Sequence, residues 1–219
     1  MRDILTIDIE GDGISNPMRD KLFPKFGHFD PDTIPWCISM CSLEGMKTYV
    51  CKLPSVGRNL GLGISTNFHE AGTSVPSELN GYQITEYKDR YQMVAHTLNE
   101  ILKYLSQGKK VYFKAFWDPM YRMSFYYDRV LLSKYMARSI MEYWKDDEEK
   151  RASLLQSVHW IVNRMRGVCI PKGHWKQTPK QGSREKLDKD VYIARGIMHN
   201  IADTEQLFQL IQEGHYFEV

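Results

Sequence analysis

The sequence predicts an α/β fold in which a mixed β-sheet is flanked by α-helices. Two observations predict it: strand-like segments dominate the early part of the chain, and segments of helical periodicity alternate with strands after it. The 219 residues, of which 42% are hydrophobic and 26% charged, suffice for one domain with a substantial core. We therefore expect residues 1–219 to form a single domain.

The composition and charge of the chain exclude several classes of protein. No segment approaches the ~18 consecutive apolar residues of a membrane span, and the N-terminus enters a strand without a charged leader. We therefore expect a soluble, intracellular (cytoplasmic) protein with no membrane partner. The net charge of +2 is too small to attract nucleic acid over the whole surface, so such affinity needs a local patch. Four cysteines lack zinc-site spacing and are expected to be reduced thiols: Cys37, Cys41, Cys51 and Cys169.

The N-terminal part predicts three strands in a meander. Residues 3–9 form the first strand, and the polar residues 11–33 form a loop. Residues 36–42 and 46–53 are rich in β-forming side chains, and a short glycine-bearing turn at 43–45 separates them. We expect these two strands to form a hairpin.

The middle of the chain predicts a loop, a helix and a strand. Residues 54–86 are expected to form a variable surface loop, because they contain many Gly, Ser, Asn and Pro residues. Apolar residues from Tyr87 to Leu105 recur at helical spacing, and Gly108 stands where a left-handed cap would end that helix. Residues 110–116 then form a strand.

The C-terminal part is predicted to be mainly helical. One helix covers residues 123–144 and ends at a charged break, 145–151. A second covers 154–165. A last helix opens at Met198 and stops before Gly214.

Two carboxylates stand one residue apart at the end of the first strand. Side chains alternate along a strand, so Asp8 and Glu10 share one face. Like charges held so close repel each other, and a divalent cation between them most easily explains the arrangement. Oxygen ligands of this kind suit Mg²⁺ or Mn²⁺. The alternative is a strand that ends in solvated acids.

Two further segments carry candidate functional groups. His199 and Asp203 are four residues apart and share one face of the last helix, although such a pair can also be a plain surface contact. Asp128 lies in the helix of residues 123–144, where it can also be an ordinary polar residue.

Together these segments resemble the DEDD (DnaQ-like) superfamily of 3′→5′ exonucleases, which has a ribonuclease H-like fold. The run around Asp8 and Glu10 is similar to the family's first motif, D-I-E-T-x-G. Residues 127–132 resemble F-D-x-V-I-L, and residues 199–203 resemble H-N-A-L-A-D, both found in phage recombination exonucleases. The three motifs follow the family's order across nearly the whole chain, which suggests a phage-like enzyme.

The chain departs from the family pattern in two places. Three residues separate His199 from Asp203, where the histidine branch of the family usually has four, so either the histidine occupies the register of the tyrosine branch or a deletion has rebuilt the helix start. Ser124 stands where an Asn usually precedes the aspartate of the second motif. Asp118 competes with Asp128 for that role, because it directly follows a strand, but before Pro119 it also suits a helix cap.

The resemblance implies a two-metal-ion mechanism with Mg²⁺ or Mn²⁺. In it, Asp8, Glu10 and Asp203 hold the ion that activates water, while Asp8 and Asp128 bind the ion beside the leaving group. His199 would accept the proton of the water. Gly11, after the first motif, would let the backbone approach the terminal nucleotide.

A basic loop is predicted at residues 166–190, beside the third motif. Phosphates would be neutralised there by Lys176, Lys180 and Arg184, and Trp175 could stack on a base. The alternative is a solvated linker.

The sequence thus predicts a metal-dependent 3′→5′ exonuclease that acts on the 3′ ends of single-stranded DNA or RNA. Two alternatives remain open: a nucleic-acid-binding module that keeps the fold without catalysis, and a ribonuclease H-like endonuclease or a phosphodiesterase of small nucleotides. The choice between DNA and RNA and the oligomeric state are left open by the sequence.

Overall fold

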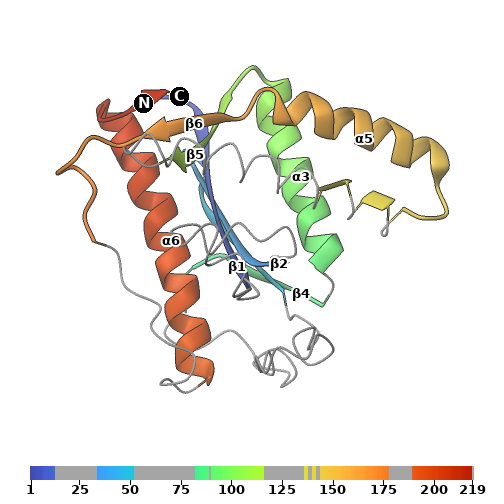
Figure 1. Cartoon of the computed structure of the whole chain (residues 1–219), viewed down its shortest axis with the longest axis horizontal. Coiled ribbons are helices and arrows are strands. Elements are labelled where there is room, and N and C mark those ends of the chain that lie inside the picture. Colours follow the sequence, from blue (N-terminus) through green and yellow to red (C-terminus); the bar gives the residue numbers. More distant parts are fainter. Residues whose placement is uncertain are drawn as a thin grey trace, which may run out of the picture.

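The chain folds around one mixed β-sheet with helices on both faces (Figure 1). The computed structural model describes residues 1–12, 34–51, 82–88, 90–115, 136–137, 140–141, 144–177 and 189–218. Its seven strands have the order β4-β3-β2-β1-β5-β6-β7. The predicted α/β class with a mixed sheet is confirmed.

The strands are β1 (Ile4–Asp12), β2 (Ile34–Ser42), β3 (Gly45–Cys51), β4 (Ile84–Tyr87), β5 (Lys110–Ala115), β6 (Arg166–Cys169) and β7 (Phe217–Glu218). The principal helices are α3 (Arg90–Ser106), α5 (Glu148–Val162) and α6 (Lys189–Glu213).

Strand β1 lies between two differently built halves of the sheet. On one side β1, β2 and β3 pair antiparallel, with the turn at Leu43 and Glu44, so the predicted meander and hairpin are confirmed. On the other side β1, β5 and β6 are parallel, and Ile7 pairs with Phe113. Residues from β5 therefore stand directly beside β1.

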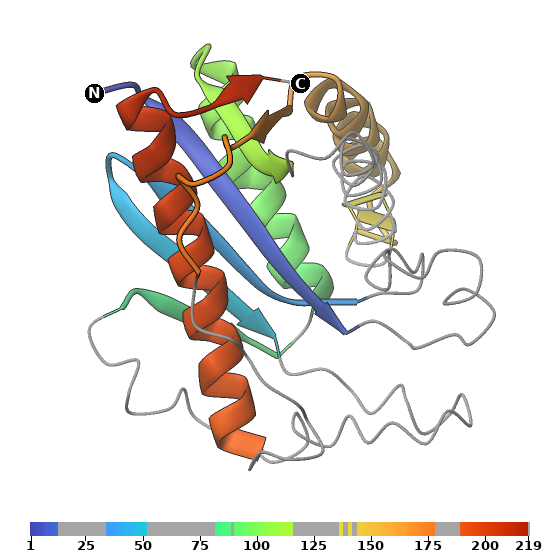
Figure 2. The same ribbon diagram turned by 60° about the vertical axis from the view of Figure 1, so that its left-hand side comes forward.

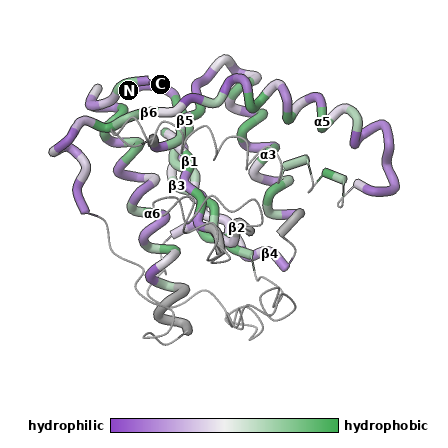
Figure 3. Tube along the Cα trace, viewed as in Figure 1, coloured by the Kyte–Doolittle hydropathy of each residue, from purple (hydrophilic) through white to green (hydrophobic). Residues whose placement is uncertain are grey.

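The two faces of the sheet have different partners. Leu5 and Ile7 of β1 belong to the large core that includes residues of α3 and α5, whereas Ile4 packs with Leu207 and Ile211 of α6. Figure 2 shows α3 and α6 on opposite sides of the strands. Hydropathy follows this arrangement, with hydrophobic positions concentrated along the central strands (Figure 3).

Small polar side chains join α6 to the sheet. Thr6 of β1 donates its hydroxyl hydrogen bond to the carbonyl of Thr204, at 3.1 Å. Thr204 in turn donates to the carbonyl of Asn200 one turn earlier, at 2.7 Å. Both threonines are fully buried, so these bonds fix where α6 crosses β1.

Two strands appear where loops were predicted. Residues 84–87 form β4, paired in parallel with β3, so this part of the predicted loop at 54–86 is wrong, and Tyr87 ends a strand rather than beginning a helix. Residues 166–169, predicted as the start of a basic loop, form β6 beside β5. Both strands are four residues long, which is too short to show a clear period in the sequence.

Two helix boundaries also differ from the prediction. Helix α5 begins at Glu148, inside the predicted charged break, because the Asp147 side chain caps it by accepting from the Lys150 N–H. Helix α6 begins at Lys189 rather than Met198, so His199 and Asp203 lie in its interior.

Three further predictions can be compared with the described residues. All four cysteines are free, as predicted, and the structure shows that all four are buried. Of the predicted helix at 123–144, only residues 136–137 and 140–141 are described within a helix, and the remaining residues before Trp144 lie outside the described part. Among the helices that the structure describes, none offers a stretch both long and apolar enough to cross a bilayer.

We expect Gly108→Ala to destabilise the chain by about 1 kcal/mol, because Gly108 has a φ of +74°, a conformation that a Cβ makes costly. No atom lies within 4 Å of the added Cβ, so the cost comes from the backbone alone. Urea denaturation measures it, with the neighbouring Gln107→Ala as control. An equal stability of both variants would contradict the strain.

Candidate active site

The two carboxylates of the first motif lie on the face of β1 that α6 covers. Asn200 of α6 donates a hydrogen bond to Asp8, and His199 of the same helix lies beside Glu10. The predicted shared face of the two acids is confirmed. The register of β1 against β2 shifts between Glu10 and Gly11, so an irregularity of the strand follows the acidic pair directly.

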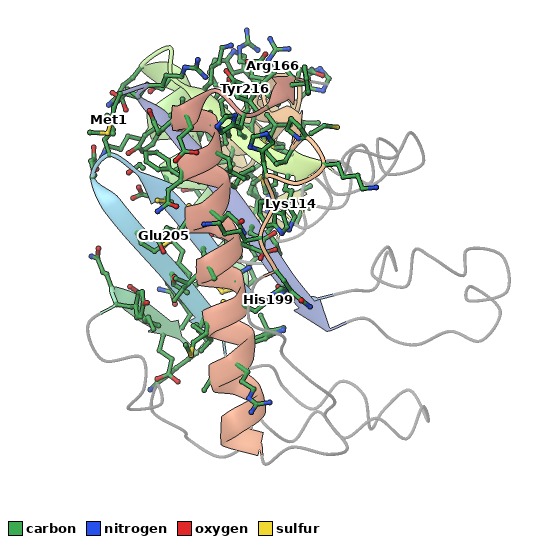
Figure 4. The ribbon with its side chains drawn as sticks, turned by 90° about the vertical axis from the view of Figure 1, so that its left-hand side faces the viewer. Met1, Lys114, Arg166, His199, Glu205 and Tyr216 are labelled. Carbon is green, nitrogen blue, oxygen red and sulfur yellow. The ribbon has the colours of Figure 1, made fainter. Side chains whose placement is uncertain are left out.

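Helix α6 brings the third motif to the same place. His199 Nε2 lies 3.8 Å from Glu10 Oε1, and His199 Nδ1 lies 3.9 Å from Asp203 Oδ1. The imidazole thus stands between a carboxylate of β1 and one of its own helix. Figure 4 shows His199 and Lys114 on the same side of α6, along β1, whereas Glu205 lies on the opposite side of this helix.

Asn200 holds the carboxylate pair in place, a role that the sequence did not reveal. Its Nδ2 donates to Asp8 Oδ2 at 3.1 Å, and a bond from its side chain also favours ionised Glu10. Its Oδ1 accepts from the thiol of Cys37 on β2 at 3.5 Å. Burial raises the pKa of Cys37 well above its usual range, and nearby Glu10 and Asp8 raise it further, so the thiol stays a donor. The bond from Cys37 therefore fixes which way the Asn200 amide points.

Lys114 is the second group that the sequence did not reveal. It follows Phe113 on β5, and its Nζ donates to Asp203 Oδ2. The same ammonium lies 4.0 Å from the centroid of the Trp175 ring. Asp203 is 5% exposed, and its second oxygen, Oδ1, has no hydrogen-bond partner among the described residues.

The surroundings of Asp8 and Glu10 disfavour the ionised form of both carboxyl groups. Burial, the largest cause, raises the pKa of Asp8 to about 6, with Asp203 adding to the shift and Lys114 opposing it. Burial likewise raises the pKa of Glu10 to about 8, with Asp8 and Asp203 adding to it. A bound cation would reverse this effect, because it favours the charged carboxylates.

We expect the chelator-treated protein to lose stability as pH rises from about 4 to about 8. The folded pKa values of about 6 and 8 exceed the ordinary values of 3.8 and 4.5, so the folded state binds more protons in this window. Thermal melting at pH 5 and pH 8 measures the change, and Asp8→Asn combined with Glu10→Gln should remove this contribution. A stability difference between the two proteins that does not change with pH would contradict the shifts.

We expect Asn200→Ala to lower the activity proposed below about 10- to 100-fold, because Asp8 loses the donor that orients it. The same change leaves buried polar groups unpaired and should cost about 2 kcal/mol of stability. Steady-state kinetics and urea denaturation test both effects. Gln209→Ala, at an exposed position of the same helix, is the control and should match the natural chain.

The carboxylate oxygens at this site are of the chemical type that binds a hard divalent cation. Carboxylate oxygens from Asp8, Glu10 and Asp203 are the ligands that Mg²⁺ and Mn²⁺ prefer, and Oδ1 of Asp203 is a buried oxygen that accepts no hydrogen bond from the described residues. As they are placed, no three His, Cys, Asp or Glu side chains in the described part form a ready-made ion site. The ligand types are therefore present, and an ion would require these side chains to converge further.

The remaining predicted site residues fall into two groups. Outside the described residues lie Asp128, its competitor Asp118, and the basic Lys180 and Arg184. Gly11 lies in β1 after the register shift. The backbone of Lys176 exchanges hydrogen bonds with the Gln206 side chain on α6, at 2.6 and 3.1 Å.

Trp175, predicted to stack on a base, contacts Lys114 in the structure. The Lys114 ammonium lies over the Trp175 ring, and the ring packs against the core cluster beneath α6. It therefore supports Lys114 in this structure, and stacking on a base stays a prediction.

Comparisons with protein-family models, with curated proteins and with solved structures find no match to this chain.

Proposed function

We propose that this chain is a metal-dependent 3′→5′ exonuclease of single-stranded DNA or RNA, with a ribonuclease H-like fold. One observation carries the proposal: groups almost 200 residues apart meet on one face of the sheet. Asn200 donates to Asp8 across 192 positions of sequence, and His199 faces Glu10. The mixed sheet around β1 is compatible with the resemblance.

The described residues have separate tasks in this proposal. Asp8, Glu10 and Asp203 would hold divalent cations, which supply a deprotonated water and neutralise charge on the leaving 3′ oxygen when bound. His199, with 30% of its side chain exposed, accepts the proton of the attacking water and can pass it to solvent. Asn200 orients Asp8.

A catalytically silent binding module is the second candidate. The ammonium of Lys114 beside Asp203 provides a positive charge inside the acidic cluster without any metal. A fold that had lost catalysis could keep such a pair for stability. Metal dependence separates the two candidates, since phosphodiester hydrolysis of this kind needs Mg²⁺ or Mn²⁺.

The test is cleavage of 5′-labelled single-stranded DNA and RNA with Mg²⁺, Mn²⁺ or chelator. We expect a metal-dependent ladder that shortens from the 3′ end and is lost in Asp203→Asn. Glu205→Gln is the matched control, because Glu205 is an exposed carboxylate of the same helix. Cleavage of a circular single strand would indicate an endonuclease, and binding without cleavage would favour the silent module.

A further inference from the structure

We propose that Lys114 is a built-in counter-ion of the acidic cluster that competes with a divalent cation for Asp203. In the metal-free protein its ammonium sits against Asp203, and binding of the cation requires this contact to loosen. The inference deepens the proposed function and rests on it in one respect, namely that Asp8, Glu10 and Asp203 are ion ligands.

The position of Lys114 is fixed from several sides. Strand β5 lies parallel to β1, and Lys114 comes one residue after the pair formed by Ile7 and Phe113, which places it beside the end of β1 that carries the acids. Its side chain is 14% exposed, and the Trp175 ring lies 4.0 Å from its Nζ. A lysine so enclosed is part of the site rather than a surface charge.

The charge of Lys114 acts on the whole cluster. It pairs directly with Asp203, and it lowers the pKa of both Asp8 and Glu10 against the effect of burial. When the three acids are ionised, three negative charges and one positive charge leave a net charge of about two negative units, which one divalent cation balances. Lys114 therefore compensates the cluster in part and leaves charge for an ion.

Asp203 is the residue for which the Lys114 ammonium and a divalent metal ion would compete. Its Oδ2 accepts from Lys114, whereas its buried Oδ1 has no hydrogen-bond partner among the described residues and lies 3.9 Å from His199 Nδ1. An ion bound at Oδ1 would stand beside the ammonium at Oδ2, and two positive charges so close repel each other. Occupation of one oxygen therefore weakens occupation of the other.

The experiment measures Mn²⁺ binding by calorimetry in the absence of nucleic acid, together with thermal melting in chelator. We expect Lys114→Met and Lys114→Gln to melt at a lower temperature than the natural chain in chelator and to bind Mn²⁺ about tenfold more tightly. Adding Asp203→Asn should abolish the gain in affinity. Lys110→Met is the control, because Lys110 lies on the same strand and pairs on the surface with Glu218.

Each outcome decides the inference. Unchanged or weaker Mn²⁺ binding in the folded Lys114 variants would overturn it, and a natural chain that still cuts DNA or RNA would then keep the proposed function intact. If the natural chain and every variant bind no Mn²⁺, the cluster is no ion site and both proposals fail. If one Lys114 variant does not fold, the other gives the affinity.

Discussion

Asp8→Asn is expected to lower the rate of the proposed hydrolysis about a thousandfold while raising the melting temperature of the metal-free protein at pH 8. The loss follows because Asp8 is assigned to both ions, and each stabilises charge in the transition state by several kcal/mol. The gain follows because burial raises the pKa of Asp8 to about 6, so its ionised form is unfavourable at pH 8. A residue that costs stability and supports function is typical of an active site.

Single-turnover cleavage and thermal melting test both halves of this prediction. The control is Asp3→Asn, because Asp3 is an acid near the same strand that pairs with Lys109 at 2.9 Å on the surface. The control should cleave at the natural rate and show no rise in melting temperature. An Asp8→Asn variant that kept full activity would show that Asp8 is not an essential ligand. A lower melting temperature of this variant at pH 8 would show that the charge of Asp8 stabilises the folded protein.

The strands around the site could be predicted because their pattern is local. Alternation along the first strand places Asp8 and Glu10 on one face, and the structure has both beside α6. The helical spacing of His199 and Asp203 likewise predicted one shared face, even though their helix starts well before them. Residues two apart in a strand, or four apart in a helix, share a face wherever the element begins.

The partners across the sheet could not be predicted in the same way. Lys114 lies near Asp203 only because β5 pairs in parallel with β1 and α6 packs on β1, and no local pattern encodes that register. Asn200 lies within the third motif, but the orientation of its amide depends on Cys37 of β2, 163 positions away in the sequence. Such contacts come from tertiary packing, which local propensity does not determine.

The early start of α6 has a similar explanation. Ala194 and Ile197 are buried ahead of the third motif, at helical spacing from the buried Ile201 within it, so the apolar stripe continues toward the N-terminus of the helix. Charged residues at 184–190 obscure this stripe in the sequence and favoured a basic loop there. Packing of this stripe on the sheet, which the sequence does not display, accompanies a helix that begins at Lys189, well before the motif.

His199→Gln is expected to lower kcat of the proposed hydrolysis about 100-fold and to change KM little. The imidazole lies 3.8 Å from Glu10 and 3.9 Å from Asp203, so it is placed to take a proton from a water held by these acids rather than to hold the nucleic acid. Glutamine keeps a polar side chain of similar reach but cannot act as a base at neutral pH. The effect should therefore appear in the rate of the chemical step.

Thermal melting distinguishes this role from a structural one. Because 30% of the His199 side chain is exposed and its contacts with Glu10 and Asp203 are 3.8 and 3.9 Å long, His199→Gln should melt close to the natural chain while kcat falls. His159→Gln is the control, since His159 is an exposed histidine of α5 that contacts Asn163, and it should keep the natural kcat. An unchanged kcat in His199→Gln would show that another base receives the proton, and a raised KM alone would assign His199 to substrate binding.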